Sequence, residues 1–198
     1  MFAKLPPATR ALLLTNVGFF LLEQVMKPVL VQWLALWAPG TSLFEPWQLV
    51  TYAFLHDGFM HILFNMFALF MFGTPLERFW GSQRFTVFYF VCVVAAGLTQ
   101  LAVAVLDHSE AVTLGASGAI FGLLLAFAMY FPRTRIMLLF PPIPLPAWLF
   151  VLIYGLLELF LGVTGNEASV AHFAHLGGML GGAVMILFWR IKDGAPKQ

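Results

Sequence analysis

The chain has 198 residues, of which 61% are hydrophobic and only 10% are charged, and its mean hydropathy is +0.91. Soluble domains carry about 25% charged residues, so this composition excludes an ordinary soluble enzyme. We expect one all-α, polytopic membrane domain over residues 1–198.

Apolar stretches of about 18 residues or more recur along the chain, and each is long enough to cross a hydrocarbon core of about 30 Å. The first stretch is too long for a signal peptide and lacks a small-residue cleavage site, so we expect it to remain as a helix. Six spans are predicted, roughly at residues 8–26, 61–76, 85–106, 117–131, 145–163 and 168–189.

The segment 27–60 is too apolar for a solvated loop and too interrupted by Pro and Gly for a span. We expect it to be amphipathic and to lie at the membrane interface, between the first two spans. Trp33, Trp37 and Trp47 suit that depth, where an indole N–H can stay hydrated.

The positively charged residues are distributed unevenly between the two sides of the membrane. Of the ten Lys and Arg residues, all but Lys27 fall on one side of the predicted spans, at the two ends of the chain and in two loops. The positive-inside rule then places both termini in the cytoplasm, and six spans satisfy that requirement. We expect a bacterial cytoplasmic (inner) membrane as the location.

Two polar side chains stand out at helix ends within the apolar chain. Ser117 opens the fourth span, and His175 lies just inside the sixth. Both would face the outer leaflet in this topology. Polar groups inside a membrane are costly and are functional candidates, and a hydroxyl beside an imidazole makes a nucleophile with its base.

Further polar residues fall toward the same leaflet. His61 and Asn65 are four residues apart on one face of the second span, and His56 lies where that span begins. We expect these three side chains to line a polar cavity through which water enters from the outer face. Together with the free amides at the start of the Ser117 helix, His61 and Asn65 could stabilise the oxyanion of a tetrahedral intermediate. Phe121, one turn after Ser117, is placed to stack on the imidazole of His175.

Small residues predict that the helices carrying Ser117 and His175 approach closely. The fourth span has Gly118, Gly122 and Ala126 at intervals of four, and the sixth has Gly178 and Gly182 on the face of His175. Residues of this size let two helix backbones pack in contact.

We expect a Ser–His dyad, because no carboxylate lies near His175 on its own span. Glu23 and Glu158 fall inside other spans, where structural hydrogen bonds or interfacial positions are expected. Cys92 is expected to be a small core residue. Zinc binding by His56, His61, His172 and His175 is disfavoured by their spacing, so neither a metal nor another cofactor is expected.

The order and spacing of these motifs resemble the rhomboid family of intramembrane serine proteases. The resemblance extends from about residue 44 to residue 189 and is to the compact six-span bacterial form. It is carried by Trp47-Gln48, His56-x4-His61-x3-Asn65, Glu77-Arg78, Trp80-Gly81, Gly115-Ala116-Ser117-Gly118 and Ala174-His175-x2-Gly178-x3-Gly182. Phe121 stands where many members carry Tyr, and Gln48 where a Trp-Arg pair is common.

This resemblance implies that Ser117 is the nucleophile and His175 the general base. It implies an oxyanion hole made of His61, Asn65 and the backbone N–H of Ser117, with lateral access of substrates near the fifth span. The expected partners are transmembrane protein substrates and the lipid bilayer, with no nucleic acid. A catalytically inactive membrane scaffold or chaperone is the alternative, and a small-solute or metal transporter is a third possibility, although no internal repeat supports it.

Overall fold

The computed structural model describes residues 5–110, 112–137, 142–164 and 171–193. The elements in chain order are α1 (Pro7–Leu34), α2 (Gln48–Thr51), η2 (Tyr52–Phe54), α3 (Phe59–Ala68), η3 (Leu69–Gly73), α4 (Thr74–Trp80), α5 (Ser82–Leu106), α6 (Ser117–Tyr130), β1 (Arg135–Met137), β2 (Pro144–Pro146), α7 (Ala147–Thr164) and α8 (His172–Asp193). Elements α3, η3 and α4 form one continuous helical segment, Phe59–Trp80, which corresponds to the second predicted span.

Six helical segments match the six predicted spans, but only five of those described are long and apolar enough to cross a membrane alone. The exception is α6, whose 14 residues extend only about 21 Å. Nine of those 14 residues are buried, so α6 is surrounded largely by protein. A helix in that position does not need to match the thickness of the lipid core.

The first helix is longer than the sequence predicted. It continues through Pro28 to Leu34, so residues 27–34 belong to α1 rather than to the interfacial segment. The proline lacks the N–H that would bond one turn back, and the distortion is confined to Met26, at φ −125° and ψ 23°. Beyond this kink the helix continues to Leu34.

The irregular segment after α1 is held by side-chain hydrogen bonds. Gln48 is fully buried, its amide oxygen accepts from the backbone of Trp37 and Glu45, and its amide nitrogen donates to the carbonyl of Leu43. The indole N–H groups of Trp37 and Trp47 donate to carbonyls in the last turn of α1 rather than to water. These bonds satisfy carbonyls that the end of a helix leaves free.

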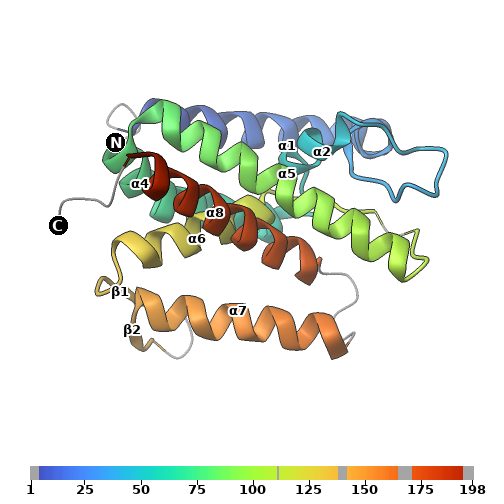
Figure 1. Cartoon of the computed structure of the whole chain (residues 1–198). Coiled ribbons are helices and arrows are strands. Elements are labelled where there is room, and N and C mark those ends of the chain that lie inside the picture. The colour runs from blue at the N-terminus through green and yellow to red at the C-terminus, as the bar shows by residue number, and fades with distance from the viewer. Residues whose placement is uncertain (1–4, 111, 138–141, 165–170, 194–198) are drawn as a thin grey trace.

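The centre of the bundle is formed by α5, α6 and α8 (Figure 1), with the most extensive helix contacts between α5 and α8 and between α6 and α8. A Cβ atom added to Gly178 would overlap the carbonyl of Gly118, and one added to Gly122 would overlap Cys92. The expected glycine packing between α6 and α8 is therefore present. Cys92 is a buried core residue, as expected.

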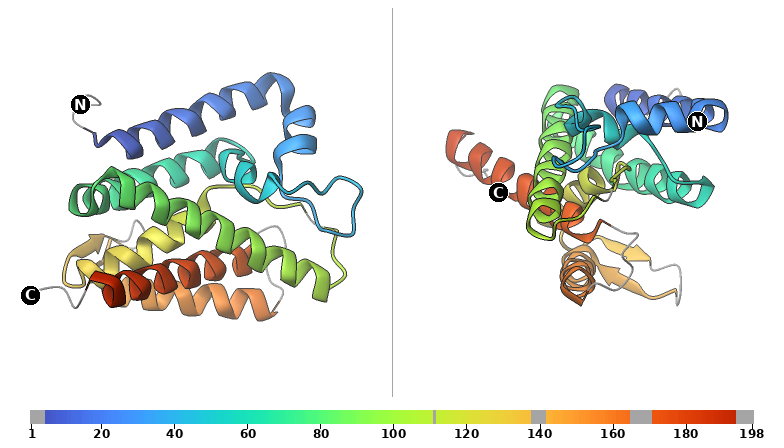
Figure 2. Two further views of the ribbon diagram at one scale, coloured as in Figure 1. Left: turned by 45° about the horizontal axis from the view of Figure 1, so that its top comes forward. Right: turned by 90° about the vertical axis from the view of Figure 1, so that its right-hand side faces the viewer.

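Helices α1 and α7 flank the bundle on opposite sides (Figure 2). The short antiparallel pair β1–β2 connects α6 to α7. Helix α1 begins and α8 ends at the same end of the bundle, while α6 and α8 begin toward the other end. The predicted start of the sixth span, Ala168, lies outside the described residues, as do the terminal charges Lys4 and Lys197.

Candidate active site

The backbone leading into α6 is fixed from two sides. Leu36, just after α1, exchanges two 2.9 Å backbone hydrogen bonds with Thr113, and the N–H of Gly115 donates to the carbonyl of Tyr52. Gly115 has φ +127°, and a Cβ atom there would lie 2.8 Å from Nε2 of His61. Only glycine fits both the conformation and the space, so Gly115 sets the distance between the start of α6 and His61.

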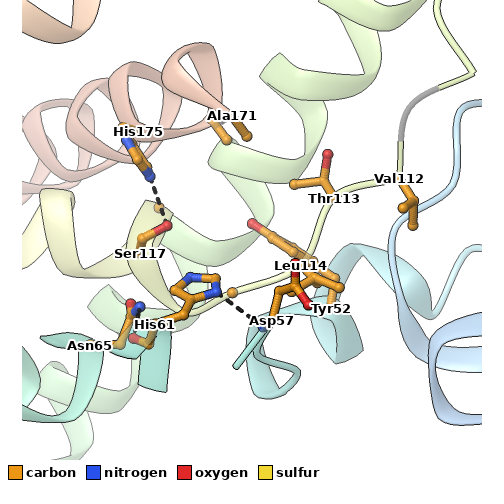
Figure 3. Close-up of a pocket in the computed structure, with 13 residues that line it drawn as sticks. Tyr52, Asp57, His61, Asn65, Val112, Thr113, Leu114, Ser117, Ala171 and His175 are labelled. Atoms are coloured by element: carbon orange, nitrogen blue, oxygen red, sulfur yellow. Dashed lines mark hydrogen bonds between the residues drawn. The ribbon is translucent and has the colours of Figure 1, made fainter. Parts of the chain in front are cut away.

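The serine and the histidine meet as expected. Nε2 of His175 lies 2.7 Å from Oγ of Ser117, although the two residues are 58 positions apart. Ser117 begins α6 and His175 lies in the first turn of α8, so both side chains sit at the same end of the closely packed helix pair. Figure 3 shows this contact at the edge of a cavity.

The imidazole of His175 is enclosed on its flat face. The ring of Phe121 stacks on it with centroids 4.3 Å apart and an angle of 9° between the planes, which confirms the expected stacking. His175 is only 7% exposed. The ring therefore has little freedom to rotate away from Ser117.

His61 and Asn65 reach the same cavity from α3 (Figure 3). Nδ1 of His61 accepts a 3.1 Å hydrogen bond from the backbone N–H of Asp57, which leaves Nε2 as the protonated, donating nitrogen. The Asn65 amide donates one hydrogen bond to the carbonyl of His61 and has a second N–H available. Both residues can thus donate to an oxygen near Ser117.

His56 does not line this cavity, contrary to the expectation. Its side chain is buried, and its ring packs edge-on against His61 with centroids 5.0 Å apart. Its backbone N–H donates to the carboxylate of Glu23, which holds the turn before α3. Burial, with a contribution from the neighbouring His61, lowers the pKa of His56 to about 3. His56 is therefore a neutral support for His61.

The cavity has a volume of about 430 Å³. Its polar lining includes Tyr52, Asp57, Thr113 and the predicted site residues His61, Asn65, Ser117 and His175. Gly178 and Gly182 lie behind it in the helix contact. The cavity is large enough for several water molecules beside Ser117.

The expectation that no carboxylate approaches His175 was wrong. Oε2 of Glu158, on α7, lies 2.8 Å from Nδ1 of His175 and 2.7 Å from Nδ1 of His172. Glu158 is buried, so the structural hydrogen bond expected for it is present. An acidic residue within an apolar span was the available signal, but its partner lies on the next helix, 17 positions later.

Glu158, His172 and His175 bring three possible metal-ligating atoms within 4.8 Å of one another. This set differs from the four histidines considered from sequence. Contacts of 2.7 and 2.8 Å are of hydrogen-bond length and engage both Nδ1 atoms with the carboxylate. The arrangement among the described residues therefore fits a hydrogen-bonded cluster better than a vacant metal site.

The comparisons with known proteins agree on one family. The Rhomboid domain matches residues 43–191. The chain is 35% identical to the yeast mitochondrial protein "Rhomboid protein 1" over 155 residues, covering 74% of this chain and 42% of that protein. It is also 35% identical to the rhomboid protease GluP of Bacillus subtilis over 138 residues, covering 70% of this chain and 25% of GluP.

A third relative is the rhomboid protease GlpG of Klebsiella pneumoniae, 35% identical over 97 residues, which covers 48% of this chain and 34% of GlpG. The chain thus spans less than half the length of each of these three relatives. The match and the apolar helices together make this chain an integral membrane protein.

Proposed function

The chain belongs to the rhomboid family, and from this premise we propose that it is an intramembrane serine endopeptidase that uses Ser117 and His175. The observation that carries the proposal is the 2.7 Å contact between Oγ of Ser117 and Nε2 of His175 inside an apolar bundle. A serine hydroxyl is a weak nucleophile until a base accepts its proton, and this geometry provides that base.

In the proposed reaction, Oγ of Ser117 attacks the carbonyl carbon of the scissile bond while its proton passes to Nε2 of His175. The tetrahedral intermediate collapses when His175 returns that proton to the leaving amine. Water then hydrolyses the acyl-enzyme, with His175 again acting as the base.

The oxyanion of each intermediate is held by His61, Asn65 and the backbone N–H of Ser117. The His61 contact with Asp57 supports this role, because it directs the proton of His61 to Nε2, the nitrogen beside Gly115. The Ser117 amide is among the first amides of α6, which have no acceptor within the helix. Donors preorganised in this way supply a large part of catalysis in acyl transfer.

The substrates are transmembrane segments of membrane proteins, cut within or beside the bilayer. A helix hides its carbonyls in hydrogen bonds, so the substrate must unwind locally before attack. Small residues at the cleavage point and a nearby Gly or Pro favour that unwinding. Water reaches Ser117 through the cavity lined by His61 and Asn65.

We place the termini in the cytoplasm and the cavity toward the outer face of a bacterial inner membrane. Support comes from the distribution of Lys and Arg and from the common end at which α1 begins and α8 ends. Accessibility of single cysteines at Arg10 and Val112 to a membrane-impermeant thiol reagent, in a Cys92→Ala background, tests this orientation. Labelling at position 10 from the outside would reverse the assignment.

The decisive test is cleavage of a transmembrane substrate in detergent and in liposomes by the wild type, Ser117→Ala and His175→Ala. Cleavage by the wild type alone is expected, together with labelling of Ser117 by a fluorophosphonate. Cleavage that survives Ser117→Ala would reject the mechanism, and strong inhibition by a chelator would point to a metal. A folded wild type that neither cleaves nor labels would favour the inactive scaffold.

A further inference from the structure

Ser117, His175 and Glu158 form one hydrogen-bonded line across three helices. Oγ of Ser117 contacts Nε2 of His175, and Nδ1 of the same ring contacts Oε2 of Glu158. Both nitrogens of the His175 imidazole are therefore hydrogen-bonded. From this geometry we propose that Glu158 is a positioning residue, which orients the imidazole of His175 for catalysis and stabilises its protonated form.

The chemistry of the three groups sets the direction of each hydrogen bond. An ionised carboxylate only accepts, so His175 carries its proton on Nδ1 and presents an unprotonated Nε2 to the hydroxyl of Ser117. That tautomer is the one a general base needs. When the proton of Ser117 moves to Nε2, the imidazolium forms beside the negative charge of Glu158. The carboxylate stays unprotonated throughout.

His172 holds the carboxylate in place. Its Nδ1 donates to the same Oε2 atom, while its Nε2 is buried without a partner among the described residues. The side chains of Glu158, His172 and His175 are only 10%, 6% and 9% exposed. A buried carboxylate needs such donors, and the second one lets Glu158 remain ionised in a largely apolar setting.

Much of α7, the helix that carries Glu158, is exposed at the surface of the bundle. Ala147, Val151 and Glu158 are the buried residues of α7, whereas large side chains such as Leu156 and Phe160 are exposed. Glu158 is the only charged residue of α7. Glu158 therefore links α7 to α8 through the same carboxylate that contacts Nδ1 of His175.

This inference rests on the proposed protease activity, and the test separates the two. We would compare the wild type, Glu158→Gln and Glu77→Gln as purified full chains with a fluorogenic transmembrane substrate. Glu77 is the matched control: it is another buried glutamate, but it accepts from the backbone of Ala8 and Thr9 at the start of α1. Helix α1 begins at one end of the bundle, whereas α6 begins toward the other (Figure 1). Each variant is measured for kcat, KM, the pH profile of kcat and thermal unfolding.

Glu158→Gln is expected to lower kcat by at least about 10-fold, and by as much as roughly 10⁴-fold if the wrong tautomer predominates. The change in KM should be small, within about twofold, because Glu158 acts on the base rather than on the bound substrate. The acid limb of the kcat profile should move to lower pH, because the imidazolium of His175 loses its counter-charge while His172 and His61 remain nearby. Glu77→Gln should lower the unfolding temperature and leave the acid limb where it is.

A folded Glu158→Gln enzyme with unchanged kcat and an unchanged acid limb would overturn the inference. If that variant does not fold, nitrogen-15 NMR of histidine-labelled wild type decides, with His175→Phe used to identify the signals of His175. Protonation of His175 at Nδ1 at neutral pH is expected, and protonation at Nε2 would overturn the role of Glu158. This readout needs no turnover, so it is independent of whether the protein cleaves substrates.

Discussion

The ring of Phe121 on α6 lies parallel to the imidazole of His175 on α8, with 4.3 Å between their centroids. Phe121 is one turn after Ser117, so α6 contributes both the hydroxyl at Nε2 and the aromatic surface under the ring. With Glu158 at Nδ1, the imidazole has a contact on its face and on both nitrogens.

Removing the ring of Phe121 should let the imidazole of His175 move more freely. Phe121→Ala is expected to lower kcat by roughly 2- to 10-fold, in line with the energy of a stacked aromatic pair, whereas Phe121→Tyr should retain activity. Phe188→Ala is the control, because Phe188 lies on the same helix as His175 and is largely exposed. Equal losses in Phe121→Ala and Phe188→Ala, measured in the cleavage assay, would contradict a specific effect of the stack.

The proposed oxyanion donors, His61 and Asn65, should act in the transition state. His61→Ala and Asn65→Ala are each expected to lower kcat by about 10²–10³-fold with a smaller change in KM, since an oxyanion exists only after attack. Fluorophosphonate labelling of Ser117 should also slow in both variants. A change confined to KM would instead place these side chains in substrate binding.

Close helix packing should depend on Gly178. Gly178→Ala adds a methyl group that overlaps the carbonyl of Gly118, so α6 and α8 must separate or shift. We expect a loss of about 1–3 kcal/mol in the free energy of unfolding and a marked fall in cleavage. Gly18→Ala is the matched control, because a Cβ atom there has nothing within 4 Å. Its stability should be unchanged or slightly higher.

Gly115 should be required both for its backbone conformation and for the space that it leaves beside the ring of His61. Gly115→Ala strains a backbone at φ +127° and places a methyl group against the His61 ring, so both stability and kcat should fall. Gly81→Ala isolates the first effect, because Gly81 has φ +80° with open space around it. The control should lose stability but keep the kcat of the folded fraction, measured by active-site titration. A normal kcat in Gly115→Ala would show that the His61 ring can shift away from the added methyl group without a loss of catalysis.

Acid should destabilise the protein through His56. Its pKa is about 3 in the folded chain, below the usual value near 6.5, so the unfolded chain binds the proton more readily between these values. The stability associated with neutral His56 is therefore complete above about pH 6.5 and decreases as the pH falls toward 3. Thermal unfolding at pH 7.5 and pH 5 should show a smaller difference for His56→Phe than for the wild type. An equal difference in both would assign the acid sensitivity to another group.

Much of this molecule follows from the order of its residues. Uninterrupted apolar stretches cannot stay in water, so the positions of the membrane helices could be predicted to within a few residues, apart from the end of α1. The contact of Ser117 with His175 was also predictable, because glycines at intervals of four mark which helix faces meet. Each of these inferences uses a period or a composition within a single segment.

Other features depended on how separate segments align in depth. Pro28 kinks α1 at Met26 without ending it, because a proline removes only its own backbone N–H from the helix, which continues to Leu34. His56 is buried behind His61 because a carboxylate from α1 holds its backbone. Glu158 meets His175 only because α7 and α8 run side by side with a particular offset. Helical periodicity tells which face a side chain occupies, but packing between helices sets its depth, so only the tertiary structure could place that carboxylate beside His175.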